Sequence, residues 1–261
     1  MRILILGGTS EALALARILE GQPGLTVISS LAGRVATPRL PAGAVRIGGF
    51  GGVDGLADYL RAERIGAVID ATHPFAARMS AHAATACAQS HVPLLALVRP
   101  DWEAEAGDRW IHVASFAEAA AGIESLGQRI FLTVGRQELT PFAQCRKAWF
   151  LIRAIETPTV PLPPRHDMVF ARGPFTLQEE EDLLRRYAID VLVSKRSGGP
   201  ATSAKLMAAR HLGLPVVMIE RPPRPAIPSV PTPEAAADWV RDLAAARLSH
   251  NDGTMSASGA P

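Results

Sequence analysis

Residues 70–76 carry the densest group of chemically capable side chains in the sequence. An apolar run, 67–69, precedes them and predicts a buried strand, and α/β sheets bind ligands where such strands end. Thr72 is expected to begin a helix with Pro74 in its first turn, so that the imidazole of His73 projects at the rim of the ligand crevice. A histidine there could move a proton, but lone histidines are often structural or solvated, and the residues leave both readings open.

The first twelve residues predict a strand, a two-glycine turn and a helix. Gly7 and Thr9 occupy the first and second glycine positions of the dinucleotide fingerprint and Ala12 the third, so the spacing survives while Thr replaces one glycine. Backbone N–H groups at such a helix start can hold a phosphate, because the helix dipole favours negative charge there. An ordinary tight turn between strand and helix is the alternative.

A second strand, 25–29, ends without the acidic residue that would accept ribose hydroxyls in a dinucleotide fold. Hydroxyl side chains follow instead, including Ser30, and then Arg34. Hydroxyls and an arginine favour a 2′-phosphate, and therefore NADPH over NADH. A polar loop with an incidental arginine explains the same residues equally well.

The second half of the chain contains two further junctions that suit an anion. A strand over 129–134 runs into Gly135, and residues 135–139 are expected to open a helix with a second anion-friendly start. A strand over 190–194 is followed by residues 195–205, which combine cations, hydroxyls and two glycines before an alanine-rich helix. These residues favour an anion or ligand site, and a merely polar turn is the alternative. The loop lacks the Walker spacing, so ATP is not implied.

The order of strands and helices predicts an α/β protein with two Rossmann-like domains, each with a mostly parallel sheet. The expected domains are residues 1–99 and 100–248, with a hinge near Pro100, and residues 249–261 are expected to be a disordered tail. Ligands should then lie in an interdomain cleft.

Composition narrows the possible functions. The net charge of +2 is too small to suggest a nucleic-acid partner, and no apolar stretch approaches the roughly 18 residues of a membrane span. Cys87 and Cys145 lack metal-ligand spacing and suggest a cytoplasmic protein. No Ser-His-Asp spacing, paired carboxylates on a helix face or metal cluster is apparent, so hydride transfer from a bound nicotinamide fits best.

Four segments together resemble the precorrin-6A reductase family of cobalamin biosynthesis: residues 7–11, 69–76, 133–136 and 194–198. The resemblance runs from residue 1 to about 220, and the segment 70–75 is its most specific part. It implies NADPH-dependent reduction of the precorrin-6A macrocycle to precorrin-6B, with hydride delivered to a conjugated C=N-type system and a proton to the neighbouring carbon. The family also includes enzymes that act on the cobalt-containing substrate, and no motif in the sequence separates the two.

The resemblance also implies roles for particular residues. The cofactor diphosphate would lie on Gly7, Gly8, Thr9 and Ser10, and the 2′-phosphate on Ser30 and Arg34. Thr72 and His73 would line the nicotinamide side, with His73 or a bound water as proton donor. The carboxylates of the tetrapyrrole, or the cofactor phosphates, would face Arg136, Lys195, Arg196, Ser197 and Gly198. An NADP-dependent reductase of another small molecule and a non-catalytic dinucleotide-binding sensor are the alternatives.

Overall fold

The chain folds into two compact units in the computed structural model, which describes residues 1–33 and 39–255. The first unit combines Met1–Arg99 with Pro223–Pro261, and the second is Pro100–Pro222. The sequence-based second domain, 100–248, therefore extends too far. The chain after Pro223 returns to the first unit because its apolar side chains, such as Ala236 and Val240, are buried in the core of that unit.

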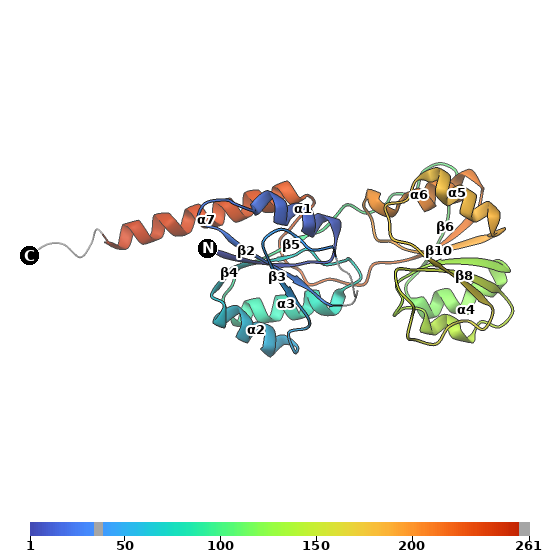
Figure 1. The fold of residues 1–261 in the computed structure, drawn as a ribbon, viewed down its shortest axis with the longest axis horizontal. Helices are drawn as coiled ribbons and strands as arrows, with labels where there is room; N and C mark the ends of the chain where they lie inside the picture. Colours follow the sequence, from blue (N-terminus) through green and yellow to red (C-terminus); the bar gives the residue numbers. More distant parts are fainter. Residues whose placement is uncertain (34–38, 256–261) are drawn as a thin grey trace, which may run out of the picture. The chain divides into compact units, whose positions relative to one another are not determined.

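The first unit is built on a six-stranded parallel sheet with the order β12-β5-β4-β1-β2-β3. The strands are β1 (Arg2–Leu6), β2 (Thr26–Leu31), β3 (Ala44–Ile47), β4 (Ile65–Asp70), β5 (Leu94–Leu97) and β12 (Ser229–Val230). Its helices are α1 (Ser10–Leu19), α2 (Val53–Ala62), α3 (Ala77–Gln89) and α7 (Pro233–Met255). In Figure 1, α1 and α7 cover one face of this sheet, and α2 and α3 cover the other.

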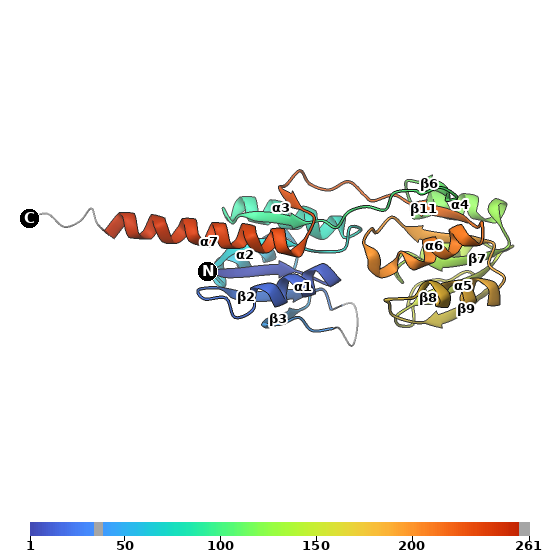
Figure 2. The ribbon, with the colours of Figure 1, turned by 90° about the horizontal axis from the view of Figure 1, so that it is seen from above.

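Strand β1 shows why the sheet needs both layers of helices. Successive side chains of a strand point to opposite faces. Ile3 and Ile5 pack with residues of α1 and α7, whereas Leu4 and Leu6 pack with residues of α2 and α3. Figure 2 shows α7 running beside α1 over the sheet. A strand buried on both faces reads as a continuous apolar run, which is why the sequence predicts it well.

The second unit has its own six-stranded parallel sheet, in the order β6-β11-β10-β7-β8-β9. The strands are β6 (Arg109–Val113), β7 (Arg129–Thr133), β8 (Trp149–Ala154), β9 (His166–Phe170), β10 (Val191–Lys195) and β11 (Pro215–Ile219). The helices are α4 (Phe116–Leu126), α5 (Leu177–Arg186) and α6 (Ala204–His211), with 3₁₀ turns η1 (Thr140–Gln144) and η2 (Pro200–Thr202). Helices α5 and α6 pack together on one face, and α4 lies on the other (Figure 1).

Both sheets have the strand order of a doubly wound dinucleotide-binding fold, 3-2-1-4-5-6. The strand in the sixth position is exchanged between the units. The chain leaves β5 of the first sheet to form β6 of the second, and it leaves β11 of the second sheet to form β12 of the first. The α/β, two-Rossmann-like fold predicted from the sequence is confirmed, whereas the exchange of strands was not predicted.

The helix expected to open at residues 135–139 does not form. The described chain has only the five-residue 3₁₀ turn η1 in this part of the second unit, with Pro141 near its start. A helix that began at residue 135 would carry Pro141 in its interior, where proline lacks the N–H that a helix needs and disfavours α-helical backbone at Thr140. The second anion-friendly helix start after β7 is therefore wrong.

The end of the chain also differs from expectation. Helix α7 continues to Met255, so residues 249–255 are helical where a disordered tail was expected. Residues 256–261 lie outside the described part. Within the described residues, no helix combines the length and the apolarity that a membrane span requires.

Candidate functional site

The turn between β1 and α1 presents backbone N–H groups at the start of a helix. Gly8 has a φ of +106°, and apart from its chain neighbours no atom of the described residues lies within 4 Å of the position that a Cβ would take. Among the described residues, no partner accepts a hydrogen bond from the N–H of Gly8 or Thr9, whereas the N–H of Gly7 donates to the carbonyl of Ser30 at 2.9 Å. The open glycine and the two N–H groups fit a phosphate or diphosphate.

The hydrogen bonds of the Thr9 side chain explain why threonine replaces a glycine of the fingerprint. Its hydroxyl accepts from the N–H of Ala12 at 3.1 Å and so caps α1, and it donates to the carbonyl of Ala71 at 2.7 Å. Strands β1 and β4 are neighbours in the sheet, and this hydroxyl ties together the turns that follow them. The structure thus brings the predicted phosphate turn and the predicted histidine turn to one edge of the sheet, at the switch point where ligands bind in such folds.

The histidine turn is organised by a buried carboxylate rather than by a helix start. Asp70 is 0% exposed, and its Oδ1 accepts from the backbone N–H and the Oγ1 of Thr72, at 3.1 and 2.6 Å. Helix α3 begins only at Ala77, so the expectation that Thr72 caps it is wrong: the Thr72 hydroxyl is used by Asp70 instead. Sequence reasoning named Asp70 within the motif but gave it no role.

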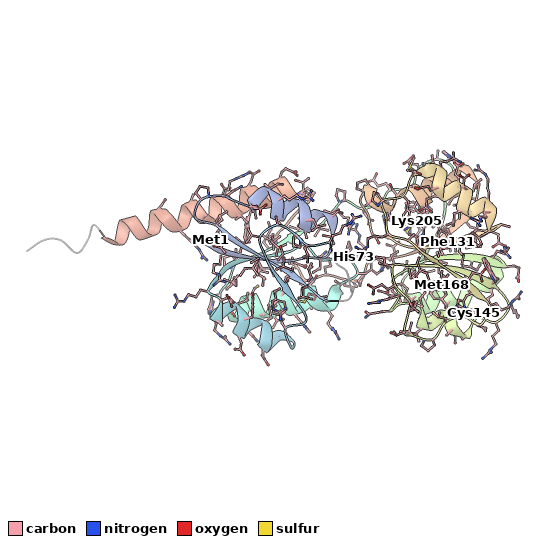
Figure 3. All side chains as sticks on the ribbon, viewed as in Figure 1. Met1, His73, Phe131, Cys145, Met168 and Lys205 are labelled. Atoms are coloured by element: carbon pink, nitrogen blue, oxygen red, sulfur yellow. The ribbon has the colours of Figure 1, made fainter. Side chains whose placement is uncertain are left out.

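His73 lies in this turn with its Nδ1 accepting from the N–H of Phe75 at 3.2 Å (Figure 3). A neutral ring that accepts at Nδ1 carries its proton at Nε2. The ring is partly buried beside the Phe75 ring, with the centroids 5.8 Å apart. The contact therefore assigns the neutral tautomer of His73, with its hydrogen on Nε2.

The adenosine end of the predicted cofactor site is described in part. Arg34, predicted to hold the 2′-phosphate, lies outside the described residues. Ser30 is buried at the end of β2, and its Oγ accepts from Nη1 of Arg46 at 3.4 Å. The Arg46 guanidinium also lies over the ring of Phe50 and donates to the carbonyl of Gly48 at 2.6 Å. The sequence analysis missed Arg46, although it is the direct cross-strand partner of Ser30 on β3.

In the second unit, the predicted substrate residues gather at the carboxyl ends of β7 and β10, which are neighbours in the sheet. Each cation there already has a carboxylate partner. Arg136 donates to Glu156 at 2.7 Å, and the Lys195 ammonium lies 3.7 Å from a carboxylate oxygen of Glu138. Because Arg136 is about one-third exposed, an incoming carboxylate can compete with Glu156 in water.

The Arg196 side chain binds neighbouring residues of the second unit. Its guanidinium pairs with Asp101 and with Glu220, each at 3.0 Å, and donates to the carbonyl of Trp102. Burial opposes ionisation of Glu220, but hydrogen bonds from His112 and Arg196 outweigh it and lower the pKa of this carboxyl. Arg196 is therefore the predicted substrate residue whose charge is most heavily neutralised within the loop.

Ser197 and Gly198, the other predicted residues of this loop, are both buried. Gly198 has a φ of +70°, and a Cβ on it would lie 2.2 Å from the carbonyl oxygen of Pro100. The Arg221 guanidinium donates to the carbonyls of Arg196 and Ser197, at 2.9 and 3.1 Å. Close backbone packing therefore requires glycine at position 198. The sequence had instead predicted that Gly198 faces the substrate or the cofactor.

A buried cation also lies behind this loop. Lys205, near the start of α6, is 6% exposed, and its ammonium lies 5.5 Å from the centre of the Trp102 ring. Burial, only partly offset by the charge of Glu180, lowers the pKa of Lys205 to about 7. Glu180 is itself held by two hydrogen bonds from Arg153, at 2.7 and 2.8 Å. Figure 3 marks the position of Lys205 in the second unit.

The described residues contain no group of three or more His, Cys, Asp or Glu side chains placed to hold a metal ion.

Comparison with known proteins gives a consistent result. The family model described as "Precorrin-6x reductase CbiJ/CobK" matches residues 2–241. A precorrin-6A reductase of Rhodococcus erythropolis is 53% identical over 93% of this chain and 98% of its own length. A solved structure titled "CobK precorrin-6A reductase" is 48% identical and covers 93% of this chain and 97% of its own, with a TM-score of 0.88. A cobalt-precorrin-6A reductase of Priestia megaterium is more distant, at 28% identity over 84% of this chain and 90% of its own length.

Proposed function

We propose, on the premise that this chain belongs to the precorrin-6x reductase family, that it catalyses the NADPH-dependent reduction of the precorrin-6A macrocycle to precorrin-6B. One observation of the structure carries the proposal. The open N–H groups of Gly8 and Thr9 and the imidazole of His73 lie on one sheet edge, and the Thr9 hydroxyl joins their turns. A phosphate cradle beside a proton-carrying group is what a nicotinamide-dependent reductase needs.

The chain's own residues would bind and orient the reactants. The N–H groups of Gly8 and Thr9 would hold the diphosphate, with Ser10 at the first position of α1. Ser30 and Arg34 would take the 2′-phosphate, and Arg46 is placed to assist them. When bound, NADPH supplies the hydride. The imidazolium form of His73, or a water held at Nε2, would then supply the proton.

The second unit would supply the substrate contacts. Precorrin-6A carries peripheral carboxylates, and arginine binds carboxylates in a bidentate manner. Arg136 and Lys195 are the cations we assign to them, because Arg196 is already held by two carboxylates, Asp101 and Glu220. Ser197 and Gly198 would shape the loop from beneath.

Identity to relatives favours the metal-free substrate over the cobalt-containing one. The relatives named precorrin-6A reductase are 46–53% identical to this chain, and those named cobalt-precorrin-6A reductase are 27–29% identical.

We also propose a cytoplasmic location and no nucleic-acid partner, in keeping with a small-molecule biosynthetic reaction and a net charge of +2.

The decisive assay mixes the purified protein with NADPH and either precorrin-6A or its cobalt form and follows the loss of cofactor absorbance. We expect oxidation of one NADPH per precorrin-6A and slower turnover of the cobalt form. NADPH binding without turnover of either substrate would favour the dinucleotide sensor, and turnover of an unrelated small molecule would favour the other reductase.

The His73→Ala variant tests the assignment of the proton donor. We expect kcat to fall by about 100-fold, within the usual range for loss of a general acid, with little change in thermal stability because the ring is partly exposed. His82→Ala, which removes a partly buried histidine of α3, is the matched control. Normal turnover by His73→Ala would remove the imidazole from the mechanism and leave water as the proton source.

A further inference from the structure

Arg224 contacts the histidine turn from the proline-rich segment between β11 and β12. Its Nη2 donates to Oδ2 of Asp70 at 2.7 Å and lies 3.3 Å from Oγ of Ser80. The two partners are 154 residues apart in the sequence. Arg224 belongs to the segment that returns from the second unit, and the prolines at 222, 223 and 225 restrict the backbone on both sides of it.

Asp70 uses both of its carboxylate oxygens. Oδ1 accepts from the N–H and the Oγ1 of Thr72, and Oδ2 accepts from Ser80 at 2.6 Å and from Arg224. Three of these four donors are neutral. An ionised carboxylate that is 0% exposed requires a countercharge, and Arg224 is the cation that an ion pair joins to Asp70.

The bonds on Oδ1 determine where His73 lies. Thr72 is held at both its N–H and its hydroxyl, and His73 is the next residue. If Arg224 were removed, the buried carboxylate would lose its charged donor, and the contacts with Thr72 and Ser80 would rearrange around it. The position of the His73 ring would change although neither Asp70 nor Arg224 would touch the reactants.

We propose that Arg224 is a positioning residue of the reductase site: its ion pair with Asp70 holds the Thr72–His73 turn in its productive geometry. The inference rests on the proposed function, and it gives the returning segment a role in the reaction as well as in the fold. Arg224 thereby links the second connection between the units to the residue assigned to proton transfer.

The chain offers a matched control for a purely structural effect. Arg247, on α7 of the same returning segment, donates to the carbonyl of Gly66 at 2.9 Å. Gly66 lies near the start of β4 and Asp70 at its end. Both arginines therefore tie the returning segment to β4, but only the Arg224 contact lies at the ligand edge.

The experiment compares Arg224→Ala, Arg224→Lys and Arg247→Ala for thermal stability, NADPH affinity, kcat and KM, all at a temperature where each variant is folded. We expect kcat of Arg224→Ala to fall by about 100-fold, the scale of a misplacement of about 1 Å at a reacting site, with KM and NADPH affinity changed by less than about 3-fold. Arg224→Lys keeps the charge and should retain most of the turnover. Millimolar guanidinium should restore part of the kcat of Arg224→Ala and leave Arg247→Ala unchanged.

Two results would overturn the inference. One is a kcat for Arg224→Ala that falls no further than that of Arg247→Ala, and the other is a loss that guanidinium and lysine both fail to restore. A failure of the proposed function looks different, because the unmodified chain would then not turn over precorrin-6A. In that case the NMR signals of the His73 ring still decide: they should shift in Arg224→Ala and not in Arg247→Ala.

Discussion

The two units use the same strand order but prepare their switch points differently. At the first, between β1 and β4, no acceptor among the described residues takes the backbone N–H groups of Gly8 and Thr9. At the second, between β7 and β10, the side chains Arg136 and Lys195 are present, but each is paired with a carboxylate. A fixed, unpaired cradle suits one invariant group such as a diphosphate, whereas exchangeable ion pairs suit a ligand with several carboxylates.

The buried charges differ in the same way. The first unit buries an anion, Asp70, with Arg224 as its own countercharge. The second buries a cation, Lys205, whose nearest opposite charge, Glu180, is already bound by Arg153. The first arrangement fixes a turn, and the second leaves a lysine whose charge is disfavoured. Sheets of the same strand order thus belong to units with different buried charges.

The largest expected effect tests whether the cradle belongs to the first unit alone. Gly8→Val places a β-branched residue at a φ of +106° and covers two N–H donors. Loss of two hydrogen bonds to a charged group, at about 1.5–3 kcal/mol each, should weaken NADPH binding by about 100-fold or more. Titration of cofactor fluorescence measures the dissociation constant.

Gly135→Ala is the matched variant at the corresponding turn of the second unit. Its Cβ would meet only the flexible carboxylate end of Glu138, so NADPH affinity should change by less than about 3-fold. Equal weakening by the two variants would mean that the second turn also holds cofactor and that the comparison is wrong.

The next largest effects come from two arginines, Arg34 assigned to the cofactor and Arg136 assigned to the substrate. Arg34→Ala should weaken NADPH by about 10-fold or more and leave NADH nearly unchanged, because a 2′-phosphate contact is charge-assisted. Arg136→Gln should instead raise KM for precorrin-6A by about 10-fold and leave NADPH affinity alone. Steady-state kinetics with both nicotinamides measures each change. If Arg34→Ala weakens NADH equally, the 2′-phosphate assignment fails, and if Arg136→Gln weakens NADPH, Arg136 binds cofactor.

The smallest effect concerns stability and pH. Because burial lowers the pKa of Lys205 from its ordinary value of 10.5 to about 7, the unfolded chain binds this proton more tightly than the folded chain. Stability contributed through Lys205 therefore rises with pH between about 7 and 10.5, and the cost of burying its charge is largest below pH 7. Lys205→Met should stabilise the protein by about 1–3 kcal/mol at pH 6 and by less at pH 9. Urea unfolding at the two pH values tests this, and a gain that grows with pH would contradict it.

Much of the fold follows from local pattern, because parallel strands such as β1 and β4 are continuous apolar runs. The exchange of the sixth strands does not follow from local pattern. The residues of β6 and β12 do not indicate which of the two sheets each strand joins. The roles of Asp70 and Arg224 depend on a contact across 154 residues, which no spacing rule contains. A charged residue flanked by prolines and an aspartate ending an apolar strand were the signals available.

The sequence predicted which turns form the candidate site better than it predicted which partners their side chains contact. Turns after β1, β4 and β10 were identified because glycines, hydroxyls and cations follow apolar runs there. What each side chain does depends on its neighbours: the Thr72 hydroxyl binds Asp70, and Arg196 pairs with Asp101 and Glu220. The expected position of the ligands in a cleft between the units stays a prediction.

The exchanged strands set an order for folding during synthesis. The second unit, Pro100–Pro222, is one continuous stretch and is complete once residue 222 has left the ribosome. The first unit has made most of its sheet by residue 99, but its core must wait for Ala236, Ala237 and Val240 of α7. The half of the protein that is translated first is therefore the half that is finished last, with the apolar side of β1 and α1 uncovered until the end of the chain arrives.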